Sequence, residues 1–143
     1  MTTIEELIIR KVIGPFTAEM TVCDVIEICG AADSHDEEEL TRPEILLYGD
    51  LEFCFHHSCP GTMSVDFQSD EPTFPPLIAG LLLELKTTRD YAVSLLNQNH
   101  IGFQINSFHG VSDDEFCEYI TDNGVILLFC EDTLAKVSVV WSH

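Results

Sequence analysis

The densest set of potential metal-binding and nucleophilic side chains lies near the middle of the chain. Cys54-Phe55-His56-His57-Ser58-Cys59 holds two thiols and two imidazoles, which are ligands that zinc prefers. Strand alternation would send Cys54 and His56 to one face and His57 to the other, and no second cluster completes a tetrahedral set. We therefore expect no metal or other cofactor, and interpret the segment as a strand end with solvent-facing histidines.

Other patterns that are typical of catalysis are weak. The chain has six cysteines and six histidines, but no cysteine has a glycine-flanked or otherwise activating context, and so negative a chain disfavours thiolate formation. With 25 acidic residues, close carboxylate pairs arise by chance. The eight glycines are dispersed and form no phosphate-binding loop. We expect a protein that is not an enzyme and has no catalytic residues.

The charge distribution is the strongest functional signal. The 143 residues carry 25 Asp and Glu against 6 Lys and Arg, a formal net charge of −19. Residues 1–76 contribute −13 and residues 77–143 contribute −6. A direct contact with nucleic acid phosphates or an anionic membrane is therefore not expected, because both need a positive surface. The chain is 45% hydrophobic with nine phenylalanines, so it can fill a core and is not an acidic disordered tail.

Two runs of carboxylates are the candidate contact sites for a protein partner. Each follows a predicted helix, and such surfaces repel themselves unless a cationic partner compensates. Aromatic residues could add hydrophobic contacts, with Tyr48, Phe74 and Phe108 as candidates. The residues that we predict to bind a partner are Asp36, Glu37, Glu38, Glu39, Asp113, Asp114, Glu115 and Tyr48.

Two helices with similar openings are predicted to precede these runs. Thr21-Val22-Cys23-Asp24 begins an apolar-periodic stretch that ends at Gly30, and Thr87-Thr88-Arg89-Asp90 begins another that runs to about Asn99. Residues 4–16 could hold a further short helix followed by a break at Gly14-Pro15, and residues 77–85 could be a strand or a helix. The acidic segment 33–39 and the connection 101–112 are predicted to be loops.

Three strands are predicted after each acidic run. In the first half they are 44–48, 51–55 and 62–67; in the second they are 116–120, 125–129 and 134–141. The turns Gly49-Asp50 and Asp122-Asn123-Gly124 join the first two strands of each half into hairpins. Leu51/Val125, Phe53/Leu127 and Phe55/Phe129 are 74 residues apart, whereas the helix boxes at Thr21 and Thr87 are 66 apart, which predicts an eight-residue insertion in 101–112.

The sequence thus predicts an α+β protein made of two divergent α-β-β-β repeats, with an antiparallel sheet and helices packed on one face. Residues 1–71 would form the first unit, the proline-rich residues 72–76 the seam, and residues 77–143 the second unit, together one compact domain. Whether the two units share one continuous sheet is left open.

A helix followed by an antiparallel meander, occurring twice, resembles the architecture of the β-lactamase-inhibitor-protein-like group, where two such units set their sheets side by side. The residues that carry the resemblance are the two helix openings at 21–30 and 87–99 and the hairpins around 48–53 and 123–127. A short, strongly acidic chain with the strand Gly49-Asp50-Leu51-Glu52-Phe53 is also similar to bacterial immunity proteins, which neutralise cognate secreted toxins.

The second resemblance implies a non-catalytic inhibitor that binds one basic toxin domain, for example a nuclease domain. The alternative is an acidic secretion chaperone that binds an effector, usually as a dimer. A small metal-binding protein or enzyme centred on residues 54–59 is a third hypothesis.

The N-terminus lacks the features of a signal peptide and the cysteines lie within apolar runs, so we expect free thiols and a cytoplasmic location. The oligomeric state is left open.

Overall fold

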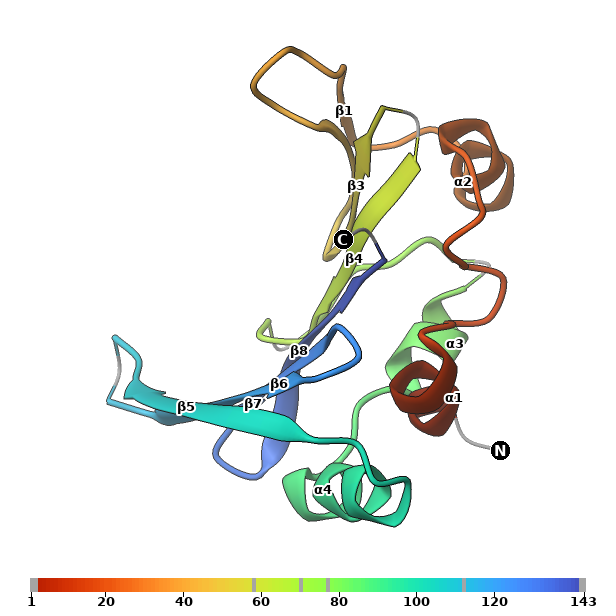
Figure 1. Cartoon of the computed structure of the whole chain (residues 1–143). Helices are drawn as coiled ribbons and strands as arrows, with labels where there is room; N and C mark the ends of the chain where they lie inside the picture. Colours follow the sequence, from red (N-terminus) through yellow and green to blue (C-terminus); the bar gives the residue numbers. More distant parts are fainter. Residues whose placement is uncertain (1–2, 58, 70, 77, 112, 142–143) are drawn as a thin grey trace.

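A single antiparallel sheet of eight strands organises the protein (Figure 1). The structure is a computed structural model that describes residues 3–57, 59–69, 71–76, 78–111 and 113–141. In chain order the elements are α1 (Thr3–Arg10), α2 (Val22–Cys29), β1 (Ser34–Asp36), β2 (Glu44–Tyr48), β3 (Leu51–His56), β4 (Cys59–Asp66), α3 (Ala79–Leu83), α4 (Arg89–Gln98), β5 (Phe103–His109), β6 (Glu115–Thr121), β7 (Val125–Cys130) and β8 (Thr133–Val140). The protein is therefore α+β, as the sequence predicted.

The order across the sheet is β1-β2-β3-β4-β8-β7-β6-β5. The two halves of the chain meet where β4 pairs with β8, so they share one continuous sheet. At the centre of this pairing Ser64 lies opposite Ser138, and their hydroxyls are 3.0 Å apart. Register shifts occur between Cys54 and Phe55 in β3 and between Leu128 and Phe129 in β7.

Two edge strands correct the prediction of loops on either side of the sheet. β1 lies inside the acidic segment 33–39, and β5 occupies most of the connection 101–112, so the loop prediction was wrong for residues 34–36 and 103–109. Each pairs with one neighbour, so its side chains stay largely exposed and need not alternate between apolar and polar. Each half therefore has four strands where three were predicted.

The helix boundaries follow their capping residues. Thr21 caps α2, with its side chain accepting from the backbone N–H of Asp24 and the Asp24 carboxylate accepting from the N–H of Thr21. Gly30 ends this helix with φ +83°, which glycine adopts without strain. The cap of α4 is Thr88 rather than Thr87, one residue later than predicted. Residues 79–83 form a helix, which decides between the two alternatives for that segment.

One face of the sheet belongs to the hydrophobic core. Its buried side chains alternate along the strands, as in β2 and β3, and they form one cluster with apolar residues from all four helices. Representative members are Leu7, Val25, Leu46, Phe53, Leu82, Leu96 and Leu127. The opposite side chains of the central strands are only half-buried; we call this the open face, and it includes Ile45, Cys54, Ser64, Phe116, Ile126, Leu128, Lys136 and Ser138.

The N-terminal segment is attached to the C-terminal half of the chain. The Asn123 amide donates to the backbone oxygen of Ile8, and the Trp141 indole N–H donates to that of Lys11, each at 2.8 Å. These bonds join residues more than a hundred positions apart in the sequence.

None of the helices that the structure describes is long and apolar enough to span a membrane.

Candidate functional site: two acidic loops and an apolar hollow

The predicted carboxylates lie in two loops at opposite ends of the sheet. Residues 37–43 connect β1 to β2, and residues 110–114 connect β5 to β6. We call the first connection together with the strand end Asp36 acidic loop 1, and the second together with the strand end Glu115 acidic loop 2. Because β1 and β5 are the two edge strands, the loops are at the extremities of the fold and do not form one cluster (Figure 1). Asp36, Glu37, Glu38 and Glu39 are exposed in the first loop, and Asp113, Asp114 and Glu115 in the second.

Acidic loop 1 uses some of its carboxylates to hold its shape. Glu38 accepts a 2.6 Å hydrogen bond from the backbone N–H of His57, and Glu39 pairs with Arg42 at 2.7 Å. Within the described residues, the structure records no such bond to the side chains of Asp36 or Glu37. The loop is thus anchored to the turn after β3 while much of its negative charge stays uncompensated.

Two backbone hydrogen bonds join the described residues of acidic loop 2, of which Ser112 lies outside the description. The N–H of Gly110 donates to the backbone oxygen of Asp114 at 2.9 Å, and the N–H of Asp113 donates to that of Gly110 at 3.0 Å. Asp113 has φ +64°, a left-handed conformation that aspartate tolerates better than most residues. The loop keeps its three carboxylates within a few residues of each other and directs their charge to solvent.

Each acidic loop also carries a fully exposed aliphatic side chain. Leu40 in acidic loop 1 has a relative exposure of 106%, and Val111 in acidic loop 2 has 110%. No other large hydrophobic side chain in the described part of the chain exceeds 48%. A single exposed apolar residue is ordinary, but the two most exposed ones both lie beside the predicted carboxylates. Neither residue was predicted from the sequence, because exposure of a loop residue is a tertiary property.

Tyr48 does not belong to this surface, which corrects its predicted role as a partner contact. Its side chain is 5% exposed, and its hydroxyl donates to the backbone oxygen of Gly30 at 2.8 Å. The hairpin already contained the signal, because Tyr48 pairs with Leu51 across the Gly49-Asp50 turn and shares its core face. Phe74 is likewise buried, whereas Phe108 is 46% exposed.

The environment of Tyr48 predicts a loss of stability at high pH. Burial, followed by Cys29 and Asp33, raises the pKa of Tyr48 to about 12, and burial raises the pKa of the Cys29 thiol to about 11. Both groups ionise more readily in the unfolded chain, so their stabilising contribution is complete below about pH 9 and is lost as the pH rises through these values. Urea titrations should show the free energy of unfolding decreasing over this range.

Two single variants test the assignment of this pH effect. Tyr48→Phe should remove the tyrosine contribution to the decrease, and Cys29→Ala should remove the thiol contribution. Equal slopes of unfolding free energy against pH in wild type and Tyr48→Phe would contradict the prediction.

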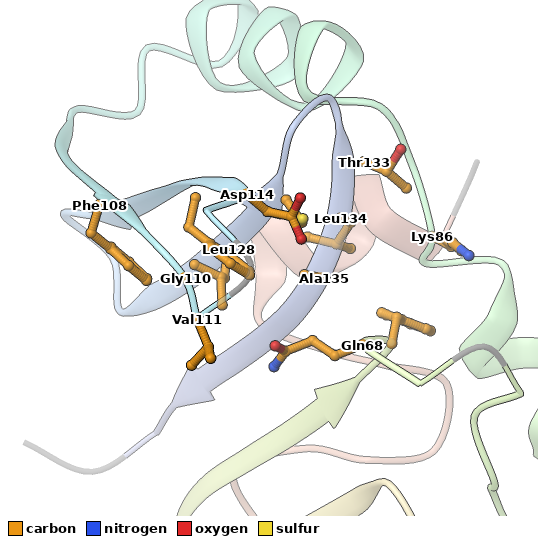
Figure 2. A pocket seen from close by; sticks show the side chains of 13 residues that line it. Gln68, Lys86, Phe108, Gly110, Val111, Asp114, Leu128, Thr133, Leu134 and Ala135 are labelled. Carbon is orange, nitrogen blue, oxygen red and sulfur yellow. The ribbon is translucent and has the colours of Figure 1, made fainter.

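An apolar hollow of about 650 Å³ lies beside acidic loop 2. The rings of Phe108 and Phe116 line it, stacked at 5.3 Å and 7°, together with Leu128 from the open face. Figure 2 shows Phe108 and Lys86 on opposite sides of the hollow, with Asp114 between them. The hollow combines apolar walls with one cation and one carboxylate, a composition suited to an apolar side chain beside a charged one. Sequence analysis could not find it, since four separate segments of the chain build it.

The described potential metal ligands of the segment 54–59 do not converge on one point. Cys54 lies on the open face with its thiol 3.4 Å from a Glu52 carboxylate oxygen, while His56 and His57 are exposed. Ser58 and the side chain of Cys59 lie outside what the structure describes. In the remainder, no group of three or more His, Cys, Asp or Glu side chains could hold a metal ion.

The five thiols that the structure describes are free, and burial makes three of them poorly suited to nucleophilic chemistry. The five are Cys23, Cys29, Cys54, Cys117 and Cys130. Burial is the main cause that raises the pKa of Cys29, Cys54 and Cys130. A raised pKa keeps a thiol protonated at neutral pH, whereas nucleophilic cysteines need the thiolate.

Compared with models of protein families, with curated proteins and with solved structures, the chain matches none of them. The features of the protein that bear on its function are therefore the geometry and charge of the two acidic loops, the apolar hollow and the sheet.

Proposed function

We propose that this protein is a non-enzymatic, acidic protein-binding module, and specifically an immunity protein that occupies a cognate basic toxin domain, such as a nuclease domain, in the cytoplasm. The observation that carries the proposal is the pairing of uncompensated carboxylates with a fully exposed aliphatic side chain in each acidic loop, at Leu40 and at Val111. Carboxylates stand in for the phosphates that a basic nuclease groove would otherwise hold.

The two kinds of side chain have complementary effects on binding. The carboxylates attract a cationic partner over a distance of about 10 Å at moderate salt and raise the association rate. Leu40 and Val111 supply apolar surface that a partner buries at about 25 cal/mol per Å², which slows dissociation. The hollow beside acidic loop 2 offers a pocket for an apolar anchor of the partner next to Asp114.

We also infer that the chain consists of two divergent copies of one unit, α2 with β1–β4 and α4 with β5–β8. The strand order is the same from each edge of the sheet to its centre. The register shifts in β3 and β7 occur 74 residues apart, the same separation as Ser64 and Ser138. We keep residues 1–71 and 77–143 as the units and 72–76 as the seam, within one domain.

The helices support this architecture. In Figure 1 they lie on the same side of the sheet, consistent with packing on one face, and the core cluster contains apolar residues from all of them. That arrangement leaves the open face and the two acidic loops available to a partner. The joining of the two units through their sheets resembles the side-by-side sheets of the β-lactamase-inhibitor-protein-like group.

We expect the gene directly upstream to encode a protein with a basic C-terminal domain, and this domain is the probe; an upstream gene without such a domain would contradict the proposal. We expect the full chain to bind this folded domain with one-to-one stoichiometry in analytical ultracentrifugation, and to inhibit it. The association rate should fall by about tenfold or more between about 50 mM and about 500 mM NaCl. A rate that is independent of salt would contradict the proposal, and a dimer that binds only an unfolded segment would favour a secretion chaperone. Stoichiometric zinc in the purified protein would favour the metal-binding hypothesis.

A further inference from the structure

The edge strand β5 lacks the features that normally prevent an edge strand from pairing with a further strand. It spans seven residues, Phe103–His109, and pairs without interruption with β6. It contains no proline, no bulge and no Asp, Glu, Lys or Arg, although 22% of the chain is charged. In the part of the chain that the structure describes, no strand pairs with its other edge. Natural sheets normally shield such an edge with charges, prolines or bulges, because it is a template for another strand.

The hydrogen bonds on either side of β5 show which of its backbone groups are free. The N–H of Asp122 donates to the oxygen of Gly102 at 2.8 Å, and the N–H of Gly110 donates to that of Asp114 at 2.9 Å. In an antiparallel pair, residues bonded to the neighbour alternate with residues that are not. Even-numbered residues of β5 therefore point their backbone groups toward β6. The residues that present N–H and C=O to the free edge are Phe103, Ile105, Ser107 and His109.

The opposite edge of the sheet is shorter and charged. β1 has three residues, and Asp36 in the strand and Asp33 and Glu37 beside it bring negative charge to that edge. A short edge with charged residues offers few backbone groups and disfavours pairing. The contrast makes β5 the edge that is suited to accept another strand.

Charge indicates what kind of strand can approach this edge. Two copies of the chain, each with a net charge of −19, repel one another. Acidic loop 2, with Asp113, Asp114 and Glu115, follows one end of β5, and the exposed Asp122 lies opposite Gly102 at its other end. An uncharged edge with carboxylates at both ends is complementary to an extended segment that carries lysine or arginine.

We propose that β5 accepts an extended segment of the basic partner as a ninth strand of the sheet, with the segment's cationic side chains beside acidic loop 2. The inference rests on the proposed function and specifies how the partner is held. The backbone of the segment pairs with the free groups of Ile105 and Ser107, among others. Its side chains on the open face lie next to Gln104, Asn106 and the partly exposed ring of Phe108.

Hydrogen exchange measured by NMR tests the pairing residue by residue. The probe is a synthetic peptide of alternating lysine and valine, about ten residues long. In the free protein the amides of Ile105 and Ser107 should exchange rapidly, while those of Gln104 and Asn106 should be protected. Saturating peptide should slow exchange at Ile105 and Ser107 by at least about tenfold. Unchanged exchange at these amides in the saturated complex would overturn the proposal.

Matched variants of the protein and of the peptide separate pairing from charge. Ser107→Pro removes an outward N–H and leaves the charge unaltered, and Ser107→Ala controls for loss of the hydroxyl, which is 3.5 Å from the Cys117 sulfur. Ser107→Pro should weaken peptide binding about tenfold relative to Ser107→Ala. A peptide with alternate N-methylated residues keeps its lysines but loses donors, and should weaken binding of the wild type to a similar degree.

The outcomes separate pairing at β5 from the proposed function. If Ser107→Pro and N-methylation leave binding unchanged while neutralised acidic loops abolish it, charge alone holds the peptide; pairing at β5 is then overturned and the acidic binding module stands. If the β5 amides are protected by self-association of the free protein, the edge serves a second copy and the proposal is also overturned. If the upstream domain does not bind but the peptide pairs with β5 as described, the proposed function fails separately.

Discussion

Neutralising the four carboxylates of acidic loop 1 is expected to slow association with the basic partner by about 10- to 100-fold at low salt. The variant carries Asp36→Asn, Glu37→Gln, Glu38→Gln and Glu39→Gln. Each amide keeps an oxygen that can accept a hydrogen bond, so the bond from His57 N–H to residue 38 can be retained. Losing the exposed Glu39–Arg42 ion pair should change the free energy of unfolding by less than about 1 kcal/mol.

A control with the same net charge shows whether position matters. Glu5, Glu6, Glu19 and Glu27 lie in or beside α1 and α2, outside both acidic loops. Changing all four to glutamine also removes four negative charges, but should slow association less than about threefold, because distant charges are screened. Stopped-flow mixing with the upstream-encoded domain measures both rates. Equal rates for the two variants would show that only total charge matters and would contradict docking at acidic loop 1.

Replacing Phe53 with alanine is expected to lower the free energy of unfolding by about 3–5 kcal/mol. Phe53 is 1% exposed and lies at the centre of an aromatic group. Its ring centroid is 5.1 Å from that of Phe16, in the segment after α1, and 6.3 Å from that of Tyr48 in β2. The substitution therefore leaves a cavity between the sheet and the N-terminal segment. For a domain with about 5–15 kcal/mol of stability, this is a large fraction.

Urea unfolding followed by fluorescence of Trp141, the single tryptophan, measures this change. Phe108→Ala is the matched control, because that ring is 46% exposed and stacks only on Phe116 among the aromatic contacts of the described residues. Its cost should be about 1 kcal/mol or less. A decrease in the free energy of unfolding below about 1 kcal/mol for Phe53→Ala would mean that the aromatic group does not hold the sheet to the N-terminal segment.

Local chemistry made the central hairpins predictable. Residues 44–48 alternate and end at Gly49-Asp50, and the observed β2 has those bounds. The Thr21 and Asp24 capping box and Gly30 likewise predicted where α2 begins and ends. In these places the residues that decide the structure are within a few positions of one another, so the sequence contains nearly all of the relevant interactions.

The edge strands were not predictable in the same way. β5, with the sequence Phe-Gln-Ile-Asn-Ser-Phe-His, has no regular apolar pattern because both of its faces stay exposed. Its pairing with β6 depends on a partner that follows it across acidic loop 2. The prediction of an eight-residue insertion in 101–112 treated this strand as loop; β5 has seven residues where β1 has three, so part of the extra length belongs to the sheet.

The sequence by itself determined the sign and size of the charge, the α+β class and the carboxylate runs, because these depend on composition and on neighbours along the chain. Only the tertiary structure decided where the charge lies: the sheet order moves the two runs to opposite ends of one sheet, and burial removes Tyr48 from the surface. It also decided that Leu40 and Val111 are exposed and that β5 has a free edge. Exposure and strand pairing are set by contacts between distant residues, which no local pattern records.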